Sequence, residues 1–138
     1  MLPFELMDHT ADIGVRAFGS SEKEVFQNAA AGMFSLIADP GLIQDREEFS
    51  VRAEAEDHEG LLVAWLNELL YLHDSRDLLL MRFEVGKLGE TTLEARVFGE
   101  PVDPGRRKLM SDIKAATYHM LKLEHSSGGW TAEVIFDV

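Results

Sequence analysis

A broad apolar stripe between residues 57 and 77 constrains the fold more than any other part of the chain. In the segment DHEGLLVAWLNELLYLHDSRD, Asp57 is predicted to be the helix N-cap. Large apolar side chains then recur at helical spacing: Leu61, Leu62, Trp65, Leu66, Leu69 and Leu70. Small domains rarely leave so large an apolar patch in water, so this helix needs a sheet to cover it. The segment is therefore predicted to be the most buried element of the fold.

The rest of the chain alternates between strand and helix patterns. A second helix is predicted within residues 20–41, because Ser21 and Glu24 have capping-box spacing and Pro40-Gly41 ends the apolar periodicity. Strands are predicted over residues 4–7, 15–19, 49–57, 78–85, 93–98, 114–125 and 130–138, with turns at 86–89 and 126–129. The predicted fold class is α+β: two helices packed on a largely antiparallel or mixed β-sheet, in a single compact domain over residues 1–138.

Composition limits the kinds of site that this domain contains. A chain of 138 residues buries roughly 70% of its unfolded surface, so it needs no disulfide or structural zinc. It has no cysteine, which excludes thiolate metal sites and cysteine nucleophiles and fits a reducing compartment. No segment has the length and apolar character of a membrane span or a signal peptide. We therefore expect a cytoplasmic protein with no membrane partner.

The charge balance favours a protein or cation partner over direct nucleic-acid binding. The chain has 13 Lys and Arg against 25 Asp and Glu, a formal net charge of −12. Nucleic-acid affinity comes largely from cationic side chains that neutralise phosphates, so contact with RNA is expected to be indirect. The acidic surface serves solubility, a basic protein partner or a cation.

Common catalytic motifs are absent from the sequence. It contains neither G-x-x-x-x-G-K-[ST] nor G-x-G-x-x-G, and neither H-E-x-x-H nor G-x-S-x-G. No two of the five histidines have the sequence spacing of a zinc pair. The pattern gives no support to a familiar nucleotide-binding, zinc-protease or serine-hydrolase site.

Carboxylates at the two ends of the chain form the clearest candidate site. Residues 8–14 read DHTADIG, and the chain closes with VIFDV. Asp8, His9 and Asp12 could form a polar turn or supply ligands to a hard cation. Asp137 lies beside the carboxylate of Val138, and two adjacent carboxylates repel unless a cation or donors neutralise them. If strands from the two ends are neighbours, Asp12, Asp137 and Val138 could form a three-oxygen site for calcium, magnesium or manganese.

Two basic features are further candidates for contacts. Lys114, between Ile113 and Ala115 at a predicted strand start, is either solvated or reaches an anionic group. The run Arg106, Arg107 and Lys108 is too short for a nucleic-acid arm. It fits a solvated loop face first and a phosphate or partner contact second.

Five blocks of sequence together resemble the archease family. They are HTADIG (9–14), GLLVAWLNELLY (60–71), FGE (98–100), IKAATYH (113–119) and VIFDV (134–138). The resemblance implies a non-catalytic accessory protein that activates the tRNA-splicing RNA ligase, which joins 2′,3′-cyclic-phosphate and 5′-hydroxyl ends. It implies that the protein promotes guanylylation of a ligase histidine and multiple turnover, and broadens the nucleotide that the ligase accepts.

The resemblance also implies roles for individual residues. It assigns Asp12, Asp137 and Val138 to a divalent-cation site, with calcium as the expected ion, and Lys114 to a functional contact. His9, in the same motif as Asp12, is a second candidate contact. The chain reads Arg106-Arg107 where the family pattern has Arg-His, which puts any role of that histidine in question here.

Two other functions compete with the ligase activator. The carboxylates could serve a metal-dependent phosphoesterase or hydrolase, because a hard cation with open positions activates water. No general acid or nucleophile of evident spacing accompanies them. The Leu/Trp stripe of residues 61–70 could instead be the exposed face of a chaperone-like binding module.

Overall fold

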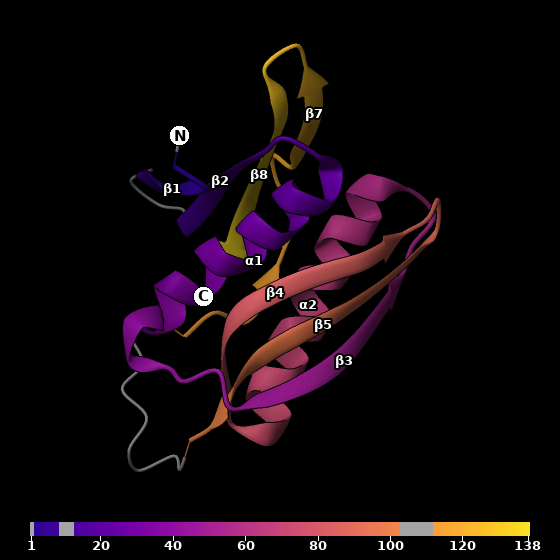
Figure 1. Ribbon diagram of the computed structural model, residues 1–138. Coiled ribbons are helices and arrows are strands. Elements are labelled where there is room, and N and C mark those ends of the chain that lie inside the picture. The colour runs from indigo at the N-terminus through magenta and orange to yellow at the C-terminus, as the bar shows by residue number, and fades with distance from the viewer. Residues whose placement is uncertain (1, 9–12, 103–111) are drawn as a thin grey trace.

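Two antiparallel sheets and two long helices make up the protein, which is represented by a computed structural model (Figure 1). The structure describes residues 2–8, 13–102 and 112–138. In chain order the elements are β1 (Phe4–Asp8), β2 (Ile13–Gly19), α1 (Glu22–Ile37), the 3-10 turn η1 (Pro40–Leu42), β3 (Glu47–Glu54), α2 (His58–Arg76), β4 (Leu78–Leu88), β5 (Thr92–Pro101), β6 (Ala115–Ala116), β7 (Lys122–Ser126) and β8 (Gly129–Asp137).

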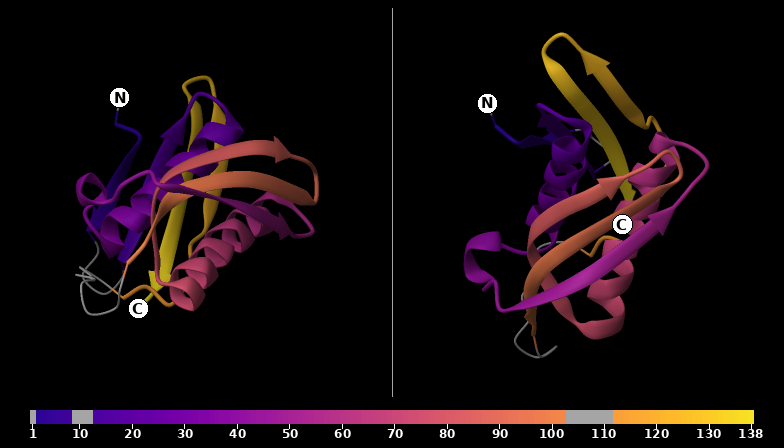
Figure 2. Two further views of the ribbon diagram at one scale, coloured as in Figure 1. Left: turned by 60° about the horizontal axis from the view of Figure 1, so that its bottom comes forward. Right: turned by 45° about the vertical axis from the view of Figure 1, so that its right-hand side comes forward.

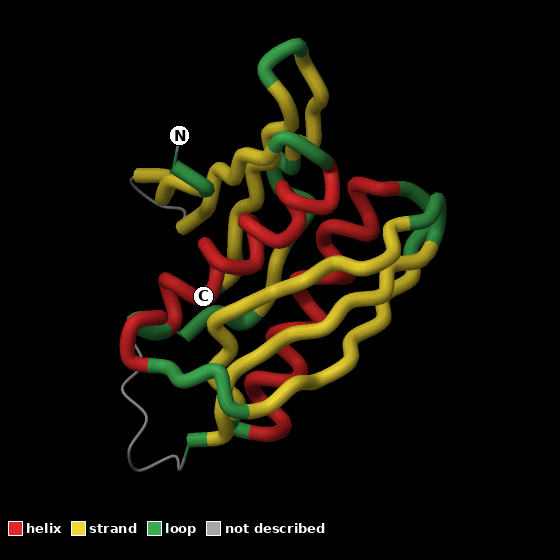
Figure 3. Tube along the Cα trace, in the orientation of Figure 1, coloured by secondary structure: helices red, strands yellow, loops and turns green. Residues whose placement is uncertain are grey.

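The five-stranded sheet joins both ends of the chain, and the three-stranded sheet comes from the middle. The five-stranded sheet has the order β1-β2-β8-β6, with β7 also paired to β8, and the three-stranded sheet has the order β3-β5-β4. Helix α1 contacts β2 and β4 and so packs against both sheets, while α2 contacts all three strands of the smaller sheet and β6. Figure 3 shows the separate sheets with the helices packed against them.

Helix α2 buries its apolar stripe as predicted, but it is not the most buried element, because α1 buries 8 of its 16 residues and α2 buries 9 of its 19. The Asp57 side chain caps it by accepting a hydrogen bond from the Gly60 N–H at 2.7 Å. All six stripe residues are at most 2% exposed, and the Trp65 indole N–H donates to the Phe26 carbonyl at 3.0 Å. Burying a large apolar side chain stabilises a fold by roughly 1.5–3 kcal/mol, so this stripe is a major source of stability.

Helix α1 begins at the predicted capping box. The Ser21 hydroxyl accepts from the Glu24 N–H at 3.1 Å, and the Glu24 carboxylate accepts from the Ser20 N–H at 2.9 Å. The helix buries Phe26, Ala30, Met33, Phe34 and Ile37. It ends at Ile37, before Pro40, whose ring is incompatible with a continuing helix.

The fold class is confirmed as α+β, but three predictions about the strands were wrong. The strands form two sheets, not one, because alternation along a strand does not reveal which strands become partners. Strand β4 continues through the predicted turn to Leu88, with irregular pairing between Val85 and Lys87. The predicted strand 114–125 divides into β6 and β7, because a turn intervenes in which Met120 has φ +52° and the Leu121 N–H donates to the Tyr118 carbonyl.

Across the described part of the chain, no helix combines the length and the apolar character needed to cross a membrane.

Candidate functional site

The two ends of the chain meet in the five-stranded sheet. Strands β2 and β8 pair antiparallel, with Ile13 opposite Phe136 at one end and Gly19 opposite Trp130 at the other. Strand β1 pairs with β2, with Asp8 opposite Ile13. The start of β2, the end of β1 and the end of β8 therefore share one edge of the sheet, which is the arrangement required for the predicted carboxylate site (Figure 1).

Lys114 and β2 lie on opposite flanks of β8, near Asp137 at the end of that strand. The Lys114 backbone N–H donates to the Asp137 carbonyl at 2.8 Å, and the next residue, Ala115, is the register partner of Asp137. The Lys114 side chain is exposed. The structure thus brings together Lys114, Asp137 and Val138 from two segments that the sequence analysis had singled out separately.

The acidic end of β8 is open to solvent. Asp137 is exposed and Val138 is 53% exposed. Side chains alternate between the faces of a strand, so Asp137 shares the outer face of the sheet with Glu133 and Ile135, while Val134 and Phe136 point into the core. An exposed carboxylate at a strand end is available to a cation or to a partner.

Gly14 permits the close approach of strands β2 and β8 at this edge. A Cβ atom added at Gly14 would lie 2.7 Å from the Val134 carbonyl oxygen and 2.9 Å from Cδ1 of Ile135. Both distances are shorter than a carbon atom tolerates, so a larger residue would force the strands apart. This role of the glycine in HTADIG was missed in the sequence analysis, because the contacting residues lie at the other end of the chain.

Asn67 fixes the β6 segment against α2. Its side-chain carbonyl accepts from the Ala116 N–H at 2.8 Å and its amide group donates to the Ala116 carbonyl at 3.2 Å. Thr117 adds a second anchor, because its hydroxyl donates to the Ile135 carbonyl at 2.8 Å. Asn67 was also missed, although an amide within a Leu-rich helix is a signal that a buried partner exists.

A row of alternating charges crosses the outer face of the same sheet. Glu5, Arg16, Glu133 and Lys122 occupy paired positions on β1, β2, β8 and β7. Arg16 contacts the carboxylates of Glu5 at 2.6 Å and Glu133 at 3.4 Å, and Lys122 contacts Glu133 at 3.3 Å. Partial burial opposes ionisation of Glu133, but hydrogen bonds from Arg16 and Lys122 outweigh it and lower the pKa of that carboxyl group. These charges neutralise one another across the four strands.

Several candidate residues lie outside the described part of the chain. They are His9 and Asp12 of the HTADIG motif and the basic run Arg106, Arg107 and Lys108. Among the side chains that the structure describes, no three from His, Asp or Glu are grouped so that they could hold a metal ion. The structure does describe two candidate ligands at this edge, Asp137 and Val138. Both offer carboxylate oxygens, which suit calcium, magnesium or manganese.

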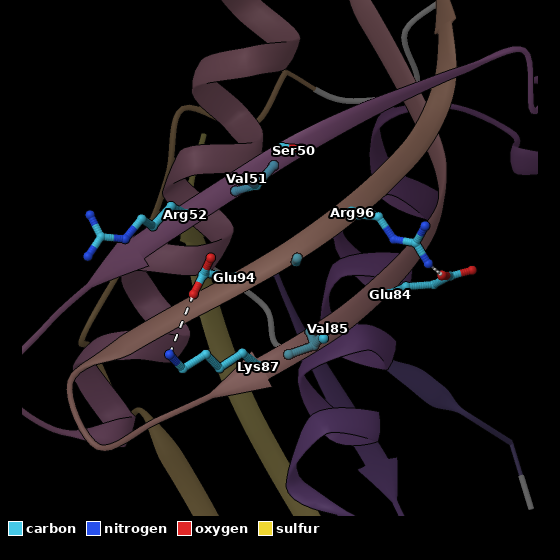
Figure 4. Close-up of a pocket in the computed structure, with 10 residues that line it drawn as sticks. Ser50, Val51, Arg52, Glu84, Val85, Lys87, Glu94 and Arg96 are labelled. Atoms are coloured by element: carbon cyan, nitrogen blue, oxygen red, sulfur yellow. Dashed lines mark hydrogen bonds and ion pairs between the residues drawn. The ribbon is translucent and has the colours of Figure 1, made fainter.

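A hollow on the outer face of the three-stranded sheet is a weaker candidate. It encloses about 630 Å³ above β3, β5 and β4 (Figure 4). Its charged side chains pair within the sheet: Lys87 with Glu94 at 3.8 Å, Arg96 with Glu84 at 2.9 Å, and Arg52 with Glu54 at 2.8 Å. Charges satisfied in this way offer little to a ligand, so the shared edge of β2, β6 and β8 remains the better candidate.

Comparison with known proteins identifies relatives along the whole chain. The sequence profile described as "Archease protein family (MTH1598/TM1083)" matches residues 4–138. The protein archease of Methanosarcina mazei is 39% identical over 139 residues, covering 98% of this chain and 95% of the relative. The protein archease of Pyrococcus furiosus is 37% identical over 142 residues, with full coverage of both chains.

Solved structures agree with the sequence relatives. The solution structure of Methanobacterium thermoautotrophicum protein 1598 matches with a TM-score of 0.84 and 37% identity, over 99% of both chains. The crystal structure of a Thermotoga maritima archease, described as a possible chaperone, matches with a TM-score of 0.62 and 25% identity, over 96% of this chain and 94% of that one. Family profile, full-length relatives and fold all coincide, and the chain belongs to the archease family.

Proposed function

We propose that this protein is a non-catalytic activator of the tRNA-splicing or RNA-repair ligase, acting in the cytoplasm by promoting ligase guanylylation and multiple turnover. The observation that carries the proposal is the pairing of Ile13 with Phe136, which joins the strand that follows Asp12 to the strand that ends in Asp137. Membership of the archease family supplies the class of partner. The same proposal includes that the protein broadens the range of nucleotides that the ligase accepts.

A divalent cation held by Asp12, Asp137 and Val138 is the second part of the proposal. Asp12 is the covalent neighbour of Ile13, and Asp137 is the neighbour of Phe136, so the β2–β8 pairing supports a shared site. Three oxygen ligands with open positions suit calcium first and magnesium or manganese second. The ion would supply a localised positive charge on a protein surface that is otherwise strongly acidic.

Lys114 is the residue that we assign to the ligase contact, and His9 is the second. The Lys114 backbone N–H binds the Asp137 carbonyl and its side chain is exposed, so the residue lies next to the end of β8 with its side chain open to solvent. A cation placed there can pair with an anionic group of the ligase. The net charge of −12 suits a partner whose RNA-binding and GTP-binding surface is basic, and contact with RNA itself would be indirect.

Burial of the Leu/Trp stripe weighs against one rival function. A chaperone-like module, the role suggested for the Thermotoga maritima relative, would need an exposed apolar face. Trp65, Leu66 and Leu69 are 0% exposed, so the stripe of residues 61–70 forms part of the core and is not accessible to another protein. A chaperone role would have to use another surface.

The metal-dependent phosphoesterase remains a defined alternative with its own assay. It uses the same carboxylates, so a panel of phosphomonoesters and phosphodiesters incubated with the pure protein and Mg²⁺ or Mn²⁺ separates the two functions. Turnover that Asp12→Ala abolishes would favour the enzyme.

The proposal itself is tested by multiple-turnover ligation. The cognate ligase, GTP, divalent metal and RNA with 2′,3′-cyclic-phosphate and 5′-hydroxyl ends are combined with and without this protein. We expect more than one ligation per ligase molecule only when the protein is present. Equal turnover in both reactions would contradict the proposal.

A further inference from the structure

A groove separate from the chain-end site lies between the end of β3, the first half of α2 and the turn after β6. It has a volume of about 600 Å³, and its lining includes Glu54, Glu56, Asp57, Val63, Ala64 and Tyr118. We name it the Tyr118 groove. Figure 2 shows α2 running beside β3, with the segment between β6 and β7 close to the start of the helix.

Backbone and amide hydrogen bonds hold the wall of the groove that carries Tyr118. Asn67 binds both backbone groups of Ala116, and the Thr117 N–H donates to the Ile135 carbonyl at 3.1 Å. After Tyr118, the Leu121 N–H closes the turn on the Tyr118 carbonyl at 3.2 Å. The segment is thus pre-organised, and a ligand that binds here pays little for ordering it.

Tyr118 itself is an exposed aromatic residue in this ordered segment. The residue is 65% exposed. Its hydroxyl oxygen reaches the first turn of α2, where a Cβ atom added at Gly60 would lie 3.3 Å away. The ring therefore spans the groove at Gly60 and leaves much of its surface available. Aromatic faces of this kind attract cations, and guanidinium groups stack on them well.

The carboxylates on the opposite wall complement a cation. Glu54, Glu56 and Asp57 line the groove, and none of the described residues lining it is Lys or Arg. Glu54 pairs with Arg52 at 2.8 Å and Asp57 caps α2, but Glu56 forms no ion pair with any residue that the structure describes. Glu56 thus differs from the carboxylates of the hollow on the three-stranded sheet, which pair with cations. The Tyr118 groove has an excess of negative charge beside an apolar floor.

We propose that the Tyr118 groove docks an arginine side chain from a basic segment of a partner protein. Val63 and Ala64 on the floor accommodate the arginine methylene groups, Glu56 pairs with the guanidinium, and the Tyr118 ring stacks on it. Lysine fits less well, because its compact ammonium group neither stacks nor pairs bidentately. Nucleic acid is disfavoured, because its phosphates would face three carboxylates. The proposal stands independently of the cation site and of the identity of the ligase.

A peptide titration followed by NMR tests this inference. The probe is the acetylated, amidated heptapeptide GRRGRRG, added to the full-length ¹⁵N-labelled protein at physiological salt. We expect the largest amide shifts in residues 54–67 and 117–120. Because a stacked or charge-assisted contact contributes on the order of 1.4 kcal/mol, Tyr118→Ala and Glu56→Gln should each weaken binding about tenfold.

Two controls separate docking from general attraction to an acidic protein. Glu124→Gln removes the same charge as Glu56→Gln from an exposed position on β7 and should change affinity less than about twofold. The heptapeptide GKKGKKG should bind more weakly than GRRGRRG. The inference is overturned if the shifts spread evenly over acidic surfaces, if Glu124→Gln matches Glu56→Gln, or if both peptides bind equally. Amide spectra of each variant verify that it remains folded.

Discussion

Ile13 lies directly opposite Phe136 in the antiparallel pairing of β2 and β8. The two residues are 123 positions apart in a chain of 138, and each is the covalent neighbour of a candidate aspartate, Asp12 or Asp137. On the other flank of β8, the Lys114 N–H binds the Asp137 carbonyl at 2.8 Å. The fold therefore collects three separate sequence motifs at one edge of the five-stranded sheet.

Replacing Gly14 by alanine is expected to destabilise the protein. The new Cβ would lie 2.7 Å from the backbone oxygen of Val134, which cannot move without separating β2 from β8. Overpacking of this kind costs about 1–3 kcal/mol, measured as the free energy of unfolding in urea. Gly128→Ala is the matched control, because its nearest neighbour, the Ser126 hydroxyl oxygen, would be 3.9 Å away. Equal stability of Gly14→Ala and the wild type would show that the strands adjust.

Protonation of His58 is expected to stabilise the fold at mildly acidic pH. Partial burial lowers the pKa of His58, but its hydrogen bonds to the Glu22 carboxylate and the Gly89 carbonyl, both 2.7 Å, outweigh burial and raise the pKa overall. A group whose pKa is raised on folding contributes stability that is fully present below its unfolded pKa of about 6.5 and is lost as the pH rises through the folded value.

The His58 effect is measured as the change in unfolding free energy between pH 6 and pH 8.5. Wild type should lose stability over this interval, and Glu22→Gln should lose less, because the charged partner of the imidazolium is gone. His125→Gln is the control, since that ring stacks on Trp130 instead of pairing with a carboxylate. A wild-type profile identical to that of Glu22→Gln would refute the assignment.

Lys114→Ala is expected to reduce ligase activation without affecting folding. The β6–β8 contact uses the backbone N–H of Lys114, which alanine retains, whereas the exposed ammonium group is lost. We expect stimulation to fall by about fivefold, the upper range for an exposed ion pair. Lys87→Ala, on the distant three-stranded sheet, is the charge-matched control and should stimulate fully. Comparable losses in the two variants would indicate a general charge effect.

Calcium binding is expected to depend on both ends of the chain. Calorimetric titration with CaCl₂ should show one site in the wild type, and Asp12→Ala or Asp137→Ala should weaken it by about tenfold or more, because each removes a ligand. Glu124→Ala removes a carboxylate from exposed β7 and should bind calcium normally. Wild-type affinity in Asp12→Ala would place the cation elsewhere.

Local patterns in the sequence predicted the helices better than the sheets. Leu61 to Leu70 and the capping residues Ser21 and Asp57 act within a few residues of one another, so periodicity and spacing were sufficient to locate α1 and α2. Assignment of the strands to two sheets depends on partners that are distant along the chain, and alternation carries no information about them.

Prediction of the site followed the same division. Motifs in the sequence were sufficient to name the candidates Asp12, Asp137, Val138 and Lys114. They do not show whether the segments that carry these residues meet. The strand register answers that question for the segments of Ile13, Asp137 and Lys114. Gly14 and Asn67 could not be assigned, because each acts on backbone atoms more than 40 residues away. Such contacts become visible only once the strands have been paired.

Guanylylation of the ligase is the most direct test of the proposed function. Transfer of labelled GMP to the ligase active-site histidine is measured in a single turnover with wild-type protein, Asp12→Ala, or a chain lacking Val138, and Glu124→Ala serves as the control. We predict full stimulation by wild type and Glu124→Ala and a loss of about tenfold or more for the other two, in line with removal of a metal ligand. Full stimulation by both Asp12→Ala and the chain lacking Val138 would contradict the account.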